Sequence, residues 1–165
     1  MNQQPTGLVN GPADARRAAV TLISAVHRNL HLYTPYVDPR LYNDAEVVNA
    51  IRAQLIEHSR ARFSLIFPPA EDWRRICPHF LQLTERLSSA MELRVLPKDE
   101  PRERPEFGQG FMIADHLRLL LLADPRRLIG NYEQDSSGKS KELLNFFLEI
   151  WEKSQPDPEL RQLRL

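Results

Sequence analysis

Two glycines and a carboxylate stand close together in the stretch FGQGFMIAD, which runs from Phe107 to Asp115. Paired glycines can cradle the phosphates of a dinucleotide when a third glycine follows three residues later and a helix begins there. Here Ile113 occupies the third glycine position, and the residues around it have the apolar pattern of a strand. The sequence therefore excludes a dinucleotide-binding fingerprint, and Gly108 and Gly110 must have another role.

Histidine and cysteine side chains could supply a metal site or a nucleophile, but their settings favour structural roles. His27 and His31 are four residues apart, yet a helix end and a strand start are expected between them, so no shared metal is predicted. Cys77 has Arg75 and His79 close by, which could lower a thiol pKa. Because no strand-to-helix elbow presents it, Cys77 is expected to be a buried small hydrophobe. No metal, cofactor or catalytic residue is predicted from these groups.

The composition is that of a soluble globular protein of one domain, with 165 residues, 42% hydrophobic and 27% charged. Lys plus Arg and Asp plus Glu both number 22, and this zero net charge argues against a dedicated nucleic-acid binder. Arginine pairs at 16–17, 74–75 and 126–127 are expected on solvated faces. With one cysteine and no signal peptide, a cytoplasmic location is expected. The longest apolar run, residues 119–123, is too short for membrane insertion.

Hydrophobic periodicity predicts the elements that must position these residues. Helical spacing predicts a first helix over residues 13–28, and alternation predicts a strand over residues 30–34. Asn43 and Glu46 have the form of a capping box for a second helix, and Ser140 is a candidate N-cap for the last one. Further strands are expected at 63–67, 93–95, 107–114, 117–122 and 127–129, and further helices at 79–88 and 140–153.

Helices and strands alternate through the first half of the chain, and strands cluster before the final helix. This order predicts an α/β fold with a mixed β-sheet flanked by helices on both faces. Residues 1–11 are expected to form a flexible N-terminal tail, residues 12–155 a single α/β domain, and residues 156–165 a C-terminal extension. The loop from Pro97 to Glu106 is polar with three prolines, and the sequence leaves open whether it closes over a cleft or stays mobile.

Four segments, in this order, resemble one half of a phospholipase D superfamily protein. They are LYTPYVDPRLY, FGQGFMIADHLRLLL, the turn LIGN and the helix ending FFLEIWEKS. The superfamily carries His-x-Lys-x4-Asp on a strand, then a second apolar strand, a glycine turn with an Asn close behind, and a helix. Aligned on Asp115, Gly108 stands at the histidine and Gly110 at the lysine, while the later turn is Gly130-Asn131. The chain resembles most closely a group of uncharacterised bacterial domains with this reduced motif, some of which follow an acetyltransferase domain.

The resemblance implies a phospholipase D-like half that has lost its reactive groups. Superfamily enzymes use one histidine as nucleophile and a second, from the other half or subunit, as general acid, while the lysine stabilises charge on the phosphoryl oxygens. Glycine supplies none of these groups, so no catalytic residue is expected. Two glycines on one face of the predicted strand would leave a groove floor bare of side chains. The residues expected around this vestigial ligand-binding cleft are Thr34, Tyr36, Asp38, Gly108, Gly110, Asp115 and Asn131.

The sequence is compatible with functions of different classes. The leading hypothesis is a catalytically inactive phospholipase D-like binding or assembly module that forms a homodimer and accepts a phosphate-containing ligand. The alternative is an active phosphodiesterase or nuclease with rearranged catalytic residues, which would use His31 or His116 beside Asp115. A weaker alternative is a regulatory module that acts with an acetyltransferase partner. Neither the ligand nor the biological process follows from the sequence.

Overall fold

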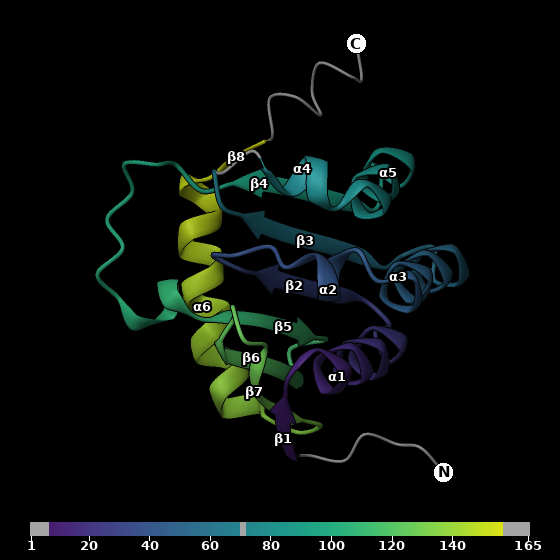
Figure 1. The fold of residues 1–165 in the computed structure, drawn as a ribbon, viewed down its shortest axis with the longest axis horizontal. Coiled ribbons are helices and arrows are strands. Elements are labelled where there is room, and N and C mark those ends of the chain that lie inside the picture. Colours follow the sequence, from purple (N-terminus) through teal and green to yellow (C-terminus); the bar gives the residue numbers. More distant parts are fainter. Residues whose placement is uncertain (1–6, 70–71, 157–165) are drawn as a thin grey trace.

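The computed structural model describes residues 7–69 and 72–156, which form one mixed sheet in the order β1-β7-β6-β5-β2-β3-β4-β8 (Figure 1). β2, β3 and β4 run parallel, and the other neighbouring pairs are antiparallel. The strands are β1 (Gly7–Asn10), β2 (Asn29–Tyr33), β3 (Arg62–Phe67), β4 (Met91–Val95), β5 (Gly110–Ala114), β6 (Arg118–Asp124), β7 (Ile129–Glu133) and β8 (Gln155–Pro156).

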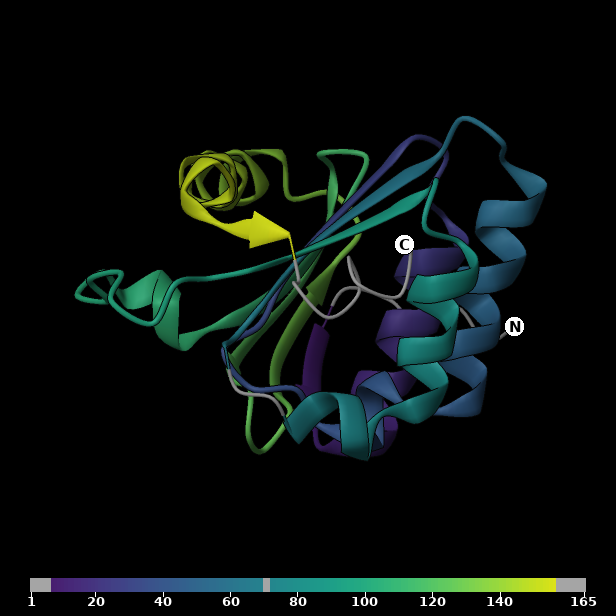
Figure 2. The same ribbon diagram turned by 90° about the horizontal axis from the view of Figure 1, so that it is seen from above.

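Helices cover both faces of this sheet, which confirms the predicted fold class. α1 to α5 lie on one face and α6 crosses the other (Figure 2). The loop between β4 and β5 projects on the side of α6 and is fastened to that helix by ion pairs from Arg104 to Glu149 and from Lys153 to Glu100. The helices are α1 (Pro12–Ser24), α2 (Pro39–Tyr42), α3 (Ala45–Glu57), α4 (Asp72–Ile76), α5 (Pro78–Arg86) and α6 (Ser137–Lys153).

Alternation along the strands produces one core on each face. Leu30 and Leu32 of β2 pack among α1 to α5, whereas Tyr33 packs beneath α6. The Tyr33 ring meets Phe146 of α6 edge-on, with ring centroids 5.7 Å apart. Its hydroxyl donates to the carbonyl oxygen of Phe107 at 2.8 Å. Tyr33 therefore joins β2, α6 and the segment that leads into β5.

The strand expected to begin at residue 107 begins only at Gly110. A 3-10 turn (Pro105–Gly108) precedes β5, and Gly108 is exposed at its end. Pro105 starts this turn because its fixed φ suits the first position of a helical turn. The expectation that Gly108 and Gly110 share one face of a strand is therefore wrong.

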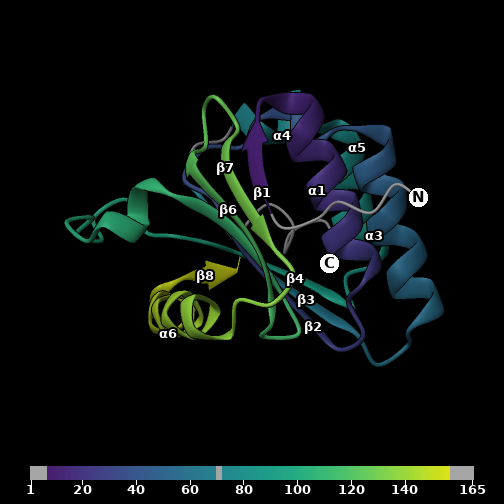
Figure 3. The ribbon, with the colours of Figure 1, turned by 90° about the horizontal axis from the view of Figure 1, so that it is seen from below.

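Local capping and the chain ends also differ from expectation. Asp44, rather than Asn43, caps α3 by accepting from the N–H groups of Glu46 and Val47, and the Asn43 side chain instead accepts from the N–H of His79. α6 begins at Ser137, so Ser140 is not its N-cap. Residues 7–10, expected in a tail, form β1 at the sheet edge beside β7 (Figure 3). Residues 1–6 and 157–165 of the expected tail and extension lie outside the described residues.

Gly130, expected in a turn, lies within β7 opposite an irregularity of β6 between Leu121 and Asp124. A Cβ at Gly130 would overlap the carbonyl oxygen and neighbouring backbone of Leu121. The backbones of β6 and β7 approach so closely there that only glycine fits.

We expect Gly130→Ala to lower the free energy of unfolding by about 1–3 kcal/mol, because the added methyl group must push two paired strands apart. Gly138 of α6 has no atom within 4 Å of where its Cβ would lie. Gly138→Ala is therefore the matched control and should be neutral or stabilising by up to about 1 kcal/mol. Urea unfolding measures both variants, and equal stability of the two would contradict the close approach.

Candidate functional site

The carboxyl ends of β2 and β3 open into a hollow of about 340 Å³, called here the β2–β3 pocket. In open α/β sheets, ligands bind outside the carboxyl ends of the strands, where the following loops diverge. The chain leaves β2 for α2 and β3 for α4 at this edge, so separate segments meet there. The pocket is lined by Pro35, Tyr36, Val37, Pro68, Asp72, Trp73, Arg75, Ile76 and Arg126.

The loop after β2 is shaped by its own polar side chains. The Thr34 hydroxyl donates to the carbonyl oxygen of Tyr36 at 2.6 Å and accepts from its N–H at 3.3 Å. Asp38 is 2% exposed, and its carboxylate accepts from the backbone N–H and the guanidinium of Arg40. Arg40 also donates to the carbonyl oxygen of Arg126, at 3.1 Å. Thr34 and Asp38 were both predicted for the cleft. They hold the loop after β2 in shape, but their own side chains do not line the pocket.

Three groups in the pocket are suited to hold a ligand. Trp73 is 2% exposed, and its indole N–H has no hydrogen-bond partner within the described part of the chain. Such buried donors are normally paired. The Arg126 guanidinium lies over the Tyr36 ring, 4.3 Å from its centroid. Arg75 and Arg126 supply two positive charges against the negative charge of Asp72. The arrangement can accept an anionic ligand that carries hydrogen-bond acceptors.

Gly110 lies next to Thr34 of the loop after β2, and Gly108 does not share this setting. A Cβ on Gly110 would lie 3.4 Å from the Thr34 hydroxyl and 3.6 Å from Cβ of Pro125. A Cβ on Gly108 would meet nothing within 4 Å. Of the seven residues predicted for the cleft, the structure brings together Thr34, Tyr36, Asp38 and Gly110.

Asp115 lies beyond the opposite end of β5. With φ of 53° it forms the turn into β6, and its carboxylate accepts from the backbone N–H groups of His27, Arg28 and Asn29, each at 2.9 Å. Burial alone would raise the pKa of Asp115, but the three backbone hydrogen bonds and the nearby charge of His27 outweigh it and lower the pKa. Asn131, the last predicted residue, is exposed within β7.

The other candidate reactive groups have unfavourable surroundings. His31 packs against His116, with ring centroids 5.8 Å apart, and edge-on to Phe147 of α6. Burial, together with the charge of His116, lowers the pKa of His31 to about 4, so its imidazole is neutral at pH 7. Burial, with a smaller effect of the Asp38 charge, raises the pKa of Cys77 to about 12. Cys77 is thus a buried thiol, as predicted, rather than a thiolate nucleophile.

Comparison with known families gives a match over residues 11–163 to a model described as "Domain of unknown function (DUF7931)". The chain belongs to this family. No curated protein matches the chain. Across residues 7–69 and 72–156, no group of three or more His, Cys, Asp or Glu could hold a metal ion, and no helix combines the length and apolar character needed to cross a membrane.

Two solved structures share the fold at low sequence identity. TrmBL2, an archaeal chromatin protein, is 14% identical with a TM-score of 0.65, over 93% of this chain and 55% of its own. The phosphatidylserine synthase of Haemophilus influenzae Rd KW20 is 16% identical with a TM-score of 0.51, over 96% of this chain and 44% of its own. The latter belongs to the phospholipase D superfamily, so the fold is distantly phospholipase D-like. The chain spans about half the length of each.

The sequence did not identify Trp73, Arg75 or Arg126 as residues of the site. The arginines belong to pairs that were expected on solvated faces, and Trp73 stands in a short helix that no periodicity reveals. Arg126 reaches the pocket from the connection between β6 and β7, more than 50 residues further along the chain. Only the arginine pairs themselves could have served as a signal, and their spacing does not distinguish a site from a surface.

We expect Asp115→Asn to lower the free energy of unfolding by about 1–3 kcal/mol, because an amide NH₂ would face a backbone N–H donor in place of an oxygen. Asn tolerates the positive φ of this position, so the loss reports the hydrogen bonds. The pKa of Asp115 is lowered from 3.8, so its stabilisation is present above that value and is lost as pH falls through the folded-state pKa. The measurement is urea unfolding at pH 7 and at about pH 2.5, where the difference should shrink. Asp135→Asn, at an exposed position, is the control.

Proposed function

We propose that this chain is a single, degenerate phospholipase D-like half that binds a ligand and does not hydrolyse phosphodiesters. The observation that carries the proposal is the lining of the β2–β3 pocket, where Arg75 and Arg126 supply positive charge. No imidazole or ammonium group is among the described residues that line the β2–β3 pocket. Enzymatic phosphodiester cleavage of this kind needs a nucleophile and a general acid beside the phosphorus. Their absence there supports binding rather than turnover.

The positions of the five histidines support the same proposal. His27 and His58 face each other where the chain enters β2 and β3, at the opposite end of these strands from the pocket. His31 and His116 lie together on the α6 side of the sheet. His79 is exposed in the first turn of α5.

The alternative function, a phosphodiesterase with rearranged residues, would place His31 or His116 beside a free Asp115 carboxylate. Both oxygens of Asp115 instead accept backbone hydrogen bonds. Three of its roughly four lone-pair positions are thus used to hold the main chain rather than to orient an imidazole. This geometry favours the binding function over the alternative.

The ligand that fits the β2–β3 pocket best is a small molecule that carries phosphate and a planar group. Arg75 and Arg126 can pair with phosphate oxygens, Trp73 can donate to an acceptor, and the Tyr36 ring offers an aromatic face. A volume of about 340 Å³ lies within the usual range of small-molecule sites. AMP is a suitable probe because it combines these features.

The proposal predicts that AMP raises the melting temperature of the full chain, by several degrees at a hundred times its Kd, where bound ligand adds about 2.7 kcal/mol. Trp73→Phe, which keeps the aromatic packing and removes the N–H, and Arg126→Gln should each weaken AMP binding at least tenfold. Arg86→Gln, at an exposed position of α5, is the control and should bind normally. Hydrolysis of bis(p-nitrophenyl) phosphate that Asp115→Asn abolishes would overturn the proposal in favour of the enzyme.

We also propose that two copies of the chain associate. One copy corresponds to about half of each solved structure that shares the fold, with 55% and 44% of their chains covered. Zero net charge leaves little electrostatic repulsion between copies. Sedimentation equilibrium should give twice the 19.1 kDa mass of one chain. A single-chain mass at the highest soluble concentration would contradict the homodimer and leave the ligand proposal standing.

A further inference from the structure

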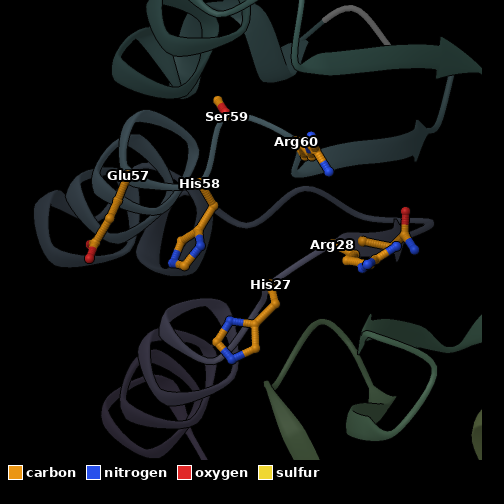
Figure 4. A pocket seen from close by; sticks show the side chains of 7 residues that line it. His27, Arg28, Glu57, His58, Ser59 and Arg60 are labelled. Atoms are coloured by element: carbon orange, nitrogen blue, oxygen red, sulfur yellow. The ribbon is translucent and has the colours of Figure 1, made fainter.

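A second hollow lies where α1 leads into β2 and α3 leads into β3. It has a volume of about 500 Å³ and is lined by residues 27–29 and 57–60; it is called here the histidine pocket. The rings of His27 and His58 lie beside each other in it, with centroids 5.4 Å apart (Figure 4). The histidine pocket and the β2–β3 pocket are therefore separated by the length of β2, and neither shares a lining residue with the other.

Both connections that form the histidine pocket are fixed by main-chain hydrogen bonds. The Asp115 carboxylate holds the N–H groups of residues 27–29. The N–H of Arg62 donates to the carbonyl oxygen of Arg28 at 2.8 Å, and the N–H of Ala61 donates to that of His58 at 3.0 Å. Because the backbone is already ordered, a ligand would not have to order either connection on binding.

The side chains of the pocket offer positive charge that other groups leave free. Arg28 and Arg60 are exposed, and neither side chain forms an ion pair with any described residue. The Glu57 carboxylate points away from the two imidazole rings (Figure 4), and the Asp115 oxygens are engaged with backbone N–H groups.

We propose that the histidine pocket binds a tetrahedral oxyanion, the phosphate group of a small phosphorylated molecule, between His27, His58, Arg28 and Arg60. A guanidinium pairs with two phosphate oxygens at once, and each imidazole ring adds an N–H donor. About 500 Å³ exceeds the volume of a phosphate group, so the pocket also has room for the organic part of the ligand. The site is independent of the β2–β3 pocket and of whatever binds there.

The test is a titration of the full, isotope-labelled chain with inorganic phosphate, followed by the ¹H–¹³C signals of its five imidazoles and the ¹H–¹⁵N signals of its two indoles. Shifts should be concentrated at His27 and His58, and the double variant Arg28→Gln/Arg60→Gln should bind at least tenfold more weakly. A response confined to the indole N–H of Trp73 would report the β2–β3 pocket and overturn the proposal.

A matched control completes the test. Arg52→Gln/Arg86→Gln removes the same charge from exposed positions of α3 and α5 outside the pocket, and it should bind as the unchanged chain does. Equal weakening in both double variants would show general charge screening and refute a site.

Discussion

The fold depends on one carboxylate that holds three backbone N–H groups. His27, Arg28 and Asn29 form the short connection from α1 to β2, where their N–H groups have left the helix and have no strand partner on that side. Asp115 satisfies all three from a turn 86 to 88 residues away in sequence. The turn after β5 is thereby joined to the connection between α1 and β2, which links the helical layer to the antiparallel half of the sheet. The same hydrogen bonds fix the position of the start of β2, the strand that has one pocket at each end.

Most polar side chains that look functional in the sequence are occupied by the fold. Thr34 and Asp38 hold their own loop in shape, and Asp115 holds a connection. A polar group with complete hydrogen bonding gains little from a ligand, whereas a buried donor without a partner gains a full hydrogen bond. The indole N–H of Trp73 is such a donor within the described part of the chain. Unsatisfied bonding is therefore the better guide to a site.

The sequence predicted elements that depend on neighbouring residues, and it missed features that depend on contacts between distant segments. Apolar periodicity predicted the strands β2 and β3 and the helices α1, α3 and α6. Each of these elements buries one face, so its apolar residues recur at the spacing of a strand or a helix. The edge strand β1 was missed because its partner, β7, lies more than 100 residues further along the chain. Gly108 was misplaced because Pro105 turns the chain before β5 begins. Trp73 and Arg126 line the same pocket because the order of the strands in the sheet places α4 near the connection between β6 and β7. Their separation in the sequence does not indicate this.

The two motif residues that carry the resemblance to phospholipase D-like proteins both have structural tasks. Gly130 permits the close approach of β6 and β7, and Asp115 holds the entry to β2. At Gly110, by contrast, the space for a side chain is bounded by Thr34, whose hydroxyl shapes the pocket loop. A Cβ there would lie at an ordinary contact distance, 3.4 Å from that hydroxyl, so the fold itself does not require glycine at this position. Determinants of the fold and of the chemistry are thus separable, and a chain that keeps only the former retains pockets in which binding needs no reaction.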